Sequence, residues 1–133
     1  MNLTEHFTLE ELVYSAIAVE HGVDNWPRAT VVRNLQSLAE DLLEPLRLWI
    51  GKGIAVTSGY RCEEVNRLAG GAKHSQHLFG EAADCYIPEG PVALLAALMA
   101  SRLAFDQAIT YRRKHILHLS YRKGNNRCQI LQR

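Results

Sequence analysis

Apolar side chains recur every three or four residues through the first part of the chain, as they do on one face of an α-helix. Thr8-Leu9-Glu10-Glu11 has the Ser/Thr-x-x-Glu form of a capping box, and the apolar residues that follow predict a helix over residues 9–20. After a turn at 21–27, the same spacing continues from Val31 to Trp49. It predicts a second, longer helix that Pro45 can kink.

The second half of the chain reads mainly as short strands rich in β-branched and apolar residues. Strands are predicted at residues 54–57, 82–87, 105–111, 116–121 and 127–131, and helices at 62–68 and 91–103. The joins at 112–114 and 123–126 are short enough for hairpins, which favours antiparallel pairing. We therefore expect an α+β fold in a single domain, residues 1–133, with N-terminal helices packed on a mostly antiparallel sheet.

Composition narrows the range of partners. With 133 residues, 47% of them hydrophobic, the chain can bury a core of its own. Its 15 basic and 14 acidic residues nearly cancel, so no long-range field favours nucleic acid or an anionic membrane. No signal-peptide pattern precedes the first helix, and the longest apolar run, residues 92–100, is about half of a membrane span. We expect a soluble monomer that is cytoplasmic as synthesised.

Two histidines and one aspartate form a candidate metal site. His77 and Asp84 flank a short loop whose Gly80 gives it freedom to bend. Alternation along the strand at 116–121 places His118 on the face opposite its apolar neighbours. Two imidazoles and one carboxylate, with a fourth position open to water, suit a catalytic zinc ion. Because isolated histidines are common on surfaces and in cores, spacing alone is weak evidence for this site.

Several ordered segments carry a family resemblance: Ser58-Gly59-Tyr60-Arg61, Asn66, Gly70-Gly71, residues 75–84 and His118-Leu119-Ser120. Together they resemble the zinc D-alanyl-D-alanine carboxypeptidase family with its phage endolysin relatives, whose fold is hedgehog/DD-peptidase-like. The resemblance extends to the helical lead-in and so spans almost the whole chain. It implies one zinc ion on His77, Asp84 and His118.

The resemblance also implies roles around the metal. Arg61 would polarise the scissile carbonyl or bind substrate, since its charge persists and its donors are fixed. Ser75 and Gln76 are candidates for substrate contacts, although they could equally be turn residues. Asp106 and Gln107 could hydrogen-bond to the loop that carries His77, or simply form the entry to a strand.

The general base is where the sequence departs from the family pattern. Many relatives have a carboxylate three residues before the last histidine ligand, and here that residue is His115. An imidazole can accept a proton near neutral pH, so catalysis remains feasible. Strict alternation turns His115 away from His118 unless the strand starts late or bends after Lys114. Glu81 is the second choice.

These features favour a zinc peptidase that cuts an amide bond in peptidoglycan stem peptides. A metal-stabilised wall-binding module without hydrolysis is the main alternative, because position 115 lacks a carboxylate. Nucleic-acid binding through the basic segment Tyr111-Arg112-Arg113-Lys114 is a third, although a solvated hairpin tip explains this segment better. The sequence leaves open which bond is cut, and whether the enzyme reaches the wall during phage lysis or acts on recycled fragments.

Overall fold

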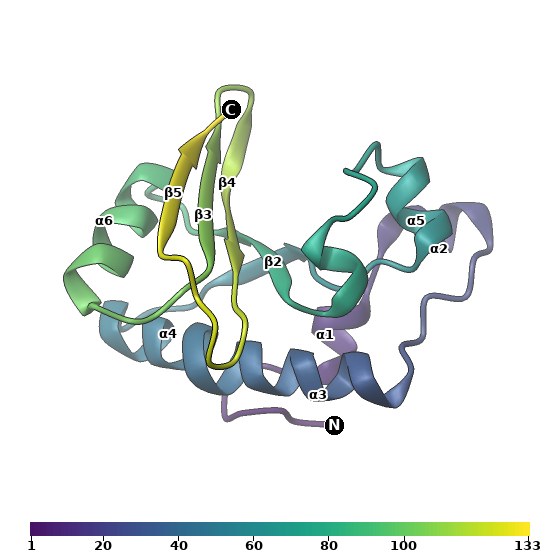
Figure 1. The fold of residues 1–133 in the computed structure, drawn as a ribbon, viewed down its shortest axis with the longest axis horizontal. Coiled ribbons are helices and arrows are strands. Elements are labelled where there is room, and N and C mark those ends of the chain that lie inside the picture. The colour runs from purple at the N-terminus through teal and green to yellow at the C-terminus, as the bar shows by residue number, and fades with distance from the viewer.

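A five-stranded sheet in the order β1-β2-β4-β3-β5 forms the centre of the structure, a computed structural model that describes residues 1–133 (Figure 1). The strands are β1 Ala55–Ser58, β2 Ala82–Tyr86, β3 Gln107–Tyr111, β4 Lys114–Ser120 and β5 Gln129–Gln132. The pairs β1–β2, β2–β4 and β3–β4 are antiparallel, and β3–β5 is parallel. The sheet is therefore mixed and mostly antiparallel, and the predicted α+β class is confirmed.

Five helical segments precede the sheet, and three more lie between its strands, two after β1 and one after β2. They are α1 Leu9–Val13, α2 Ala16–His21, α3 Ala29–Leu38, the π-helical turn η1 Ala39–Leu43, α4 Glu44–Ile50, α5 Glu63–Leu68, the 3₁₀ turn η2 Gln76–Phe79 and α6 Pro91–Ser101. Figure 1 shows α3 and α4 as one long rod along the lower side of the sheet. None of the helices is both long and apolar enough to cross a lipid bilayer.

The first predicted helix is wrong in its continuity, because two short helices occupy residues 9–20. Tyr14 leaves the helical region with ψ 133°, and Ser15 is extended with φ −140°. The Ser15 hydroxyl then accepts a hydrogen bond from the backbone N–H of Ala18 and caps a new helix. A serine that can bond to nearby backbone competes in this way with helix continuation.

The long predicted helix is confirmed over α3, η1 and α4. Its middle is a π-helical turn, in which the N–H of Glu44 bonds to the carbonyl of Ala39. Pro45 follows in the first turn of α4 and has no N–H to donate. The π-helical turn changes the pattern of backbone hydrogen bonds just before Pro45, where one N–H is lacking. The helix therefore continues through the proline.

The predicted hairpin between the last two strands is also wrong. β5 pairs with β3 rather than with β4 and runs parallel to β3. Because β4 is already paired with β2 on one side and β3 on the other, it has no free edge for β5. After β4 the chain therefore passes the start of β3, where the N–H of Cys128 donates to the Phe105 carbonyl, and β5 adds to the outer edge of β3.

The hydrophobic core lies between the sheet and the helices. Leucines of the α3–α4 rod meet alternate residues of β2 and β4, namely Ala83, Cys85, Leu117 and Leu119. Since successive side chains of a strand point to opposite faces, Asp84 and His118 lie on the other face of the sheet. Because their neighbours along the strands are packed in the core, Asp84 and His118 point away from it.

Asn25 connects the helical lead-in to the sheet, a role that its position in a turn did not predict. Its buried amide donates to the carbonyl oxygens of Val13 at 2.8 Å and Tyr60 at 3.0 Å. Its side-chain oxygen accepts from the N–H of Cys62 at 2.8 Å. One side chain therefore fixes the backbone on both sides of Arg61.

We expect Asn25→Ala to destabilise the protein by about 3 kcal/mol, because it leaves buried backbone groups without partners. The matched control is Asn34→Ala, which removes one exposed hydrogen bond to the Phe79 carbonyl and should cost about 1 kcal/mol or less. Urea unfolding of both variants tests this. Equal losses would show that Asn25 has no special structural role.

Candidate metal centre

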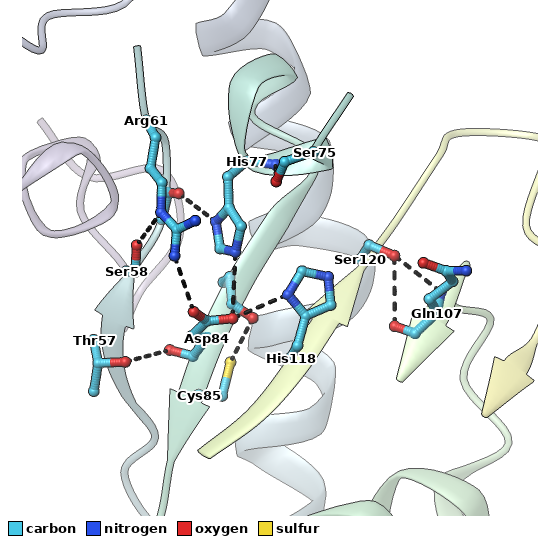
Figure 2. A network of polar contacts seen from close by, with 12 residues as sticks. Thr57, Ser58, Arg61, Ser75, His77, Asp84, Cys85, Gln107, His118 and Ser120 are labelled. Carbon is cyan, nitrogen blue, oxygen red and sulfur yellow. Dashed lines mark hydrogen bonds and ion pairs between the residues drawn. The ribbon is translucent and has the colours of Figure 1, made fainter. Parts of the chain in front are cut away.

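Three buried side chains from separate elements converge on one point: His77 of η2, Asp84 of β2 and His118 of β4. Asp84 and His118 are directly paired across β2 and β4. The nearer carboxylate oxygen of Asp84 lies 3.0 Å from His118 Nδ1 and 3.3 Å from His77 Nε2. Figure 2 shows both imidazoles pointing at this carboxylate. The predicted ligand set is thus brought together in space.

The orientation of His77 is set by the backbone around it. Its Nδ1 lies 2.7 Å from the Gly59 carbonyl oxygen, which can only accept a hydrogen bond, so Nδ1 carries the proton. The Ser75 hydroxyl accepts from the His77 N–H, and the His77 carbonyl accepts from the N–H of Arg61. In the neutral ring, Nε2 is therefore left with a free lone pair that faces Asp84.

The charges at this point favour a bound cation. Burial tends to raise the pKa of Asp84, but its polar contacts with His118 and His77 outweigh burial and hold that pKa well below its usual range. Burial lowers the pKa of His77, although Asp84 acts in the opposite direction. A neutral His77 then directs a lone pair at an ionised carboxylate. A metal ion between them relieves this repulsion.

The distances from the two imidazole nitrogens to Asp84 also fit zinc. Two atoms that each lie about 2.1 Å from a tetrahedral ion are about 3.4 Å apart. The two nitrogen-to-oxygen distances to Asp84, 3.0 and 3.3 Å, are close to this value. The donors, two imidazoles and one carboxylate, are those of catalytic zinc sites. The second nitrogen of His77 also has the carbonyl partner that usually accompanies such ligands.

Arg61 reaches the same carboxylate from the end of β1. Its Nη2 lies 3.4 Å from the outer oxygen of Asp84, and its Nε donates to Ser58 at 3.0 Å (Figure 2). Its Nη1 donates to Asn66 at 3.3 Å. Asn66 in turn donates to the Ala72 carbonyl. Because a guanidinium has five N–H donors, two remain for a substrate.

Ser75 and Gln76 line the cleft beside the ligands but have structural partners. Ser75 caps η2. The Gln76 amide donates to Asp106 at 3.0 Å. Contact between Asp106 and the loop that carries His77, one of two alternatives considered from sequence, is therefore present. Substrate binding by Ser75 and Gln76 stays a prediction.

The two candidate bases lie outside the cleft lining. Glu81 lies 3.7 Å from the Arg122 guanidinium and 3.5 Å from the Gln76 amide. His115 is exposed, and its ring packs near Tyr86, with centroids 5.8 Å apart, and against Gly90. β4 pairs irregularly with β3 around His115, but Lys114 and His118 both line the cleft and His115 does not, as strict alternation predicts. Neither residue contacts the metal ligands.

A cleft of about 530 Å³ opens above the three ligands. One wall is the loop at residues 69–75, and the other comes from β3, β4 and the chain that leads to β5. Asp84 is the single acidic side chain in the lining, which also holds five permanent cations: Arg61, Lys114, Arg122, Arg127 and Arg133. The cleft therefore suits a substrate with negative charge.

Asp106 joins the cleft walls beneath this surface. Its fully buried carboxylate accepts from the backbone N–H, Nε and Nη2 of Arg127 as well as from Gln76. These hydrogen bonds from Arg127 hold the pKa of Asp106 at about 2, although burial acts to raise it. The segment before β5 is thereby tied to the loop of His77.

We expect Asp106→Asn to lower the free energy of unfolding by about 2 kcal/mol at neutral pH, through loss of hydrogen bonds to a charged group. A carboxylate with a depressed pKa stabilises the fold above its unfolded pKa, and this stability is lost as pH falls through the folded pKa. The difference between the native chain and the variant should therefore shrink as pH falls from 3.8, the usual pKa of an aspartate, towards about 2. Denaturant unfolding across pH 2–7 measures it, and a constant difference contradicts the assignment.

Gly59 provides a second test, because a side chain there has no room. A Cβ atom at Gly59 would lie 2.2 Å from the Leu12 carbonyl oxygen, whereas Gly53 has no neighbour within 4 Å. We expect Gly59→Ala to cost about 1–3 kcal/mol of stability and to weaken zinc binding about 10-fold or more, because the carbonyl that orients His77 must move. Gly53→Ala should leave both quantities near native values in unfolding and metal-titration experiments. Native zinc affinity in Gly59→Ala would show that this carbonyl is dispensable.

Comparison with known proteins agrees with this geometry. A search of curated proteins finds no match. The family model for peptidase M15 matches residues 5–120, which include the whole ligand set and Arg61. This span covers most of the 133 residues. The chain belongs to the M15 family of D-Ala-D-Ala carboxypeptidase-type metallopeptidases.

Proposed function

We propose that this protein is a zinc-dependent hydrolase that cuts an amide bond in peptidoglycan stem peptides. The observation that carries the proposal is the buried His77–Asp84–His118 site at the floor of a cationic cleft, within an M15 peptidase chain. A zinc ion held there would act as a Lewis acid and promote ionisation of the attacking water. The stem peptides carry free carboxylates, which suit the cations of the cleft.

Arg61 is the residue that we assign to the scissile carbonyl. Its side chain is fixed by Ser58 and Asn66 on one side and by Asp84 on the other. A guanidinium held in this way loses little entropy when it binds substrate, and its remaining N–H groups can donate to an oxygen that becomes negative. Ser75, at the end of the loop that lies beside Arg61, is proposed to contact the substrate backbone.

The proton of the attacking water needs an acceptor, for which Glu81 and His115 remain the proposed candidates. Glu81 is the closer of the two to Asp84 along the chain, and it would have to leave Arg122 and Gln76 to enter the cleft. His115 would have to leave its position against Tyr86 and Gly90. Either change is a side-chain rotation of a partly or fully exposed group.

A wall-peptide binding module without hydrolysis is the second candidate. One observation favours it: no acidic side chain other than Asp84 lines the cleft, and Asp84 belongs to the ligand set. This alternative predicts the same metal content and the same affinity for anionic peptides, but no bond cleavage.

The two candidates are separated by measuring zinc content and the release of new amino groups from purified peptidoglycan. We expect one zinc per native chain and cleavage, and loss of both in His118→Ala, because removal of one of three ligands opens the site. His21→Ala is the matched control, since His21 is exposed on α2 and bonds only to the Ile17 carbonyl. Zinc binding without release of amino groups would favour the binding module.

A further inference from the structure

Tyr111 lies in the cleft beside the ligand set, whereas the sequence predicted it only as the last residue of a strand and the first of a basic segment. Gln107, Ile109 and Tyr111 alternate along β3 and all line the cleft. Ile109 is paired directly with His118. The Tyr111 ring therefore projects from the same face as the ligands, one pleat, or about 7 Å of strand, beyond the row that contains His118.

The Tyr111 hydroxyl is available to a ligand, because it forms no hydrogen bond within the protein, whereas Tyr121 bonds to Asp41. The Nζ atom of Lys114 lies 4.8 Å from the centre of the Tyr111 ring, which fixes the ring by a cation–π contact. Burial raises the pKa of Tyr111 and the Asp84 charge adds to this, while Arg133 and Arg61 lower the pKa. The net rise keeps the phenol protonated, and thus a donor, at neutral pH.

Tyr111 and Arg61 flank the ligand set from opposite sides. In the sheet order β1-β2-β4-β3, Arg61 follows β1, Asp84 and His118 occupy the two middle strands, and Tyr111 is on β3. A peptide laid across these strands above the metal ligands would pass between the guanidinium and the phenol. The guanidinium and the phenol can both donate a hydrogen bond to a peptide oxygen, and neither would repel an oxygen that becomes negative.

We propose that Tyr111 is a catalytic residue that donates a hydrogen bond to the scissile carbonyl oxygen as this oxygen gains negative charge, across the site from Arg61. The inference rests on the proposed function, since it names a further group in the same reaction. The proton stays on the phenol, and Tyr111 forms no covalent bond. A fixed donor of this kind stabilises the transition state more than the substrate.

The test uses Tyr111→Phe, which removes the hydroxyl and keeps the ring over which Lys114 lies. The first readout is the affinity of zinc-loaded protein for a D-Ala-D-Ala phosphinate, whose tetrahedral anionic group imitates the charged oxygen. The second is the kcat and KM for the corresponding peptide. Tyr14→Phe is the matched control, since Tyr14 is exposed and lies outside the cleft lining. Zinc content and thermal unfolding establish that each variant is folded and loaded.

We expect Tyr111→Phe to weaken phosphinate binding about 10-fold or more and to lower kcat about 100-fold, with KM little changed. Values within twofold of native for both phosphinate affinity and kcat would overturn the assignment, as would a native protein that does not bind the phosphinate. If the native chain binds the phosphinate but cleaves nothing, the proposed hydrolysis fails. In that case, weaker phosphinate binding by Tyr111→Phe than by the native chain still supports Tyr111 as the donor. Equal phosphinate binding by the two proteins overturns the assignment.

Discussion

The carboxylate of Asp84 is the point on which the site depends, because it contacts nitrogen atoms of side chains from three other parts of the chain. His77 approaches it from a 3₁₀ turn, His118 from the neighbouring strand and Arg61 from the end of β1. A buried carboxylate is stable only when its charge is compensated. Any element that moves therefore leaves a buried charge with fewer partners, so formation of the fold and formation of the site are coupled.

Backbone groups and buried polar side chains hold these approaching segments in place. The Gly59 carbonyl orients His77, and the Gly59 backbone packs closely against Leu12 of α1. Glycine at this position therefore allows the close contact with α1 and also positions a candidate metal ligand. Asn25 fixes the chain around Arg61. Asp106 fastens the loop of His77 to the chain before β5. Gly59, Asn25 and Asp106 each hold a loop by hydrogen bonds, because these loops are too polar to be held by apolar packing.

The features that could be predicted from sequence are those that follow from periodicity. Alternation in β2 and β4 places Ala83 and Leu117 in the core, and the same alternation directs Asp84 and His118 to the opposite face. The fold class and the grouping of the metal ligands therefore follow from local patterns and the family resemblance. The division of residues 9–20 at Ser15 could have been suspected, because serine is a common N-cap.

The features that could not be predicted depend on contacts between distant parts of the chain. Nothing local to residues 123–131 shows that both edges of β4 are occupied, which is why the last strand joins β3. Asn25 reads as an ordinary turn residue until Tyr60 and Cys62 are placed beside it. Tyr111 likewise reads as the end of a strand next to a basic hairpin. Its place in the cleft depends on how β3 pairs with β4 and on an irregularity in that pairing.

The charge balance of the cleft bears on how such a site can work with so few carboxylates. Lys114 and Arg133 form no ion pair within the protein, while Arg61 shares Asp84 with two histidines. In a partly enclosed cleft, this excess of positive charge favours every anion formed during hydrolysis, both the ionised water and the charged carbonyl oxygen. Because water ionises more readily in such a cleft, a separate general base has less to contribute to removal of the proton from water. Stabilisation of the carbonyl oxygen by fixed donors then becomes the main contribution of the protein, and this is the role that we propose for Arg61 and Tyr111.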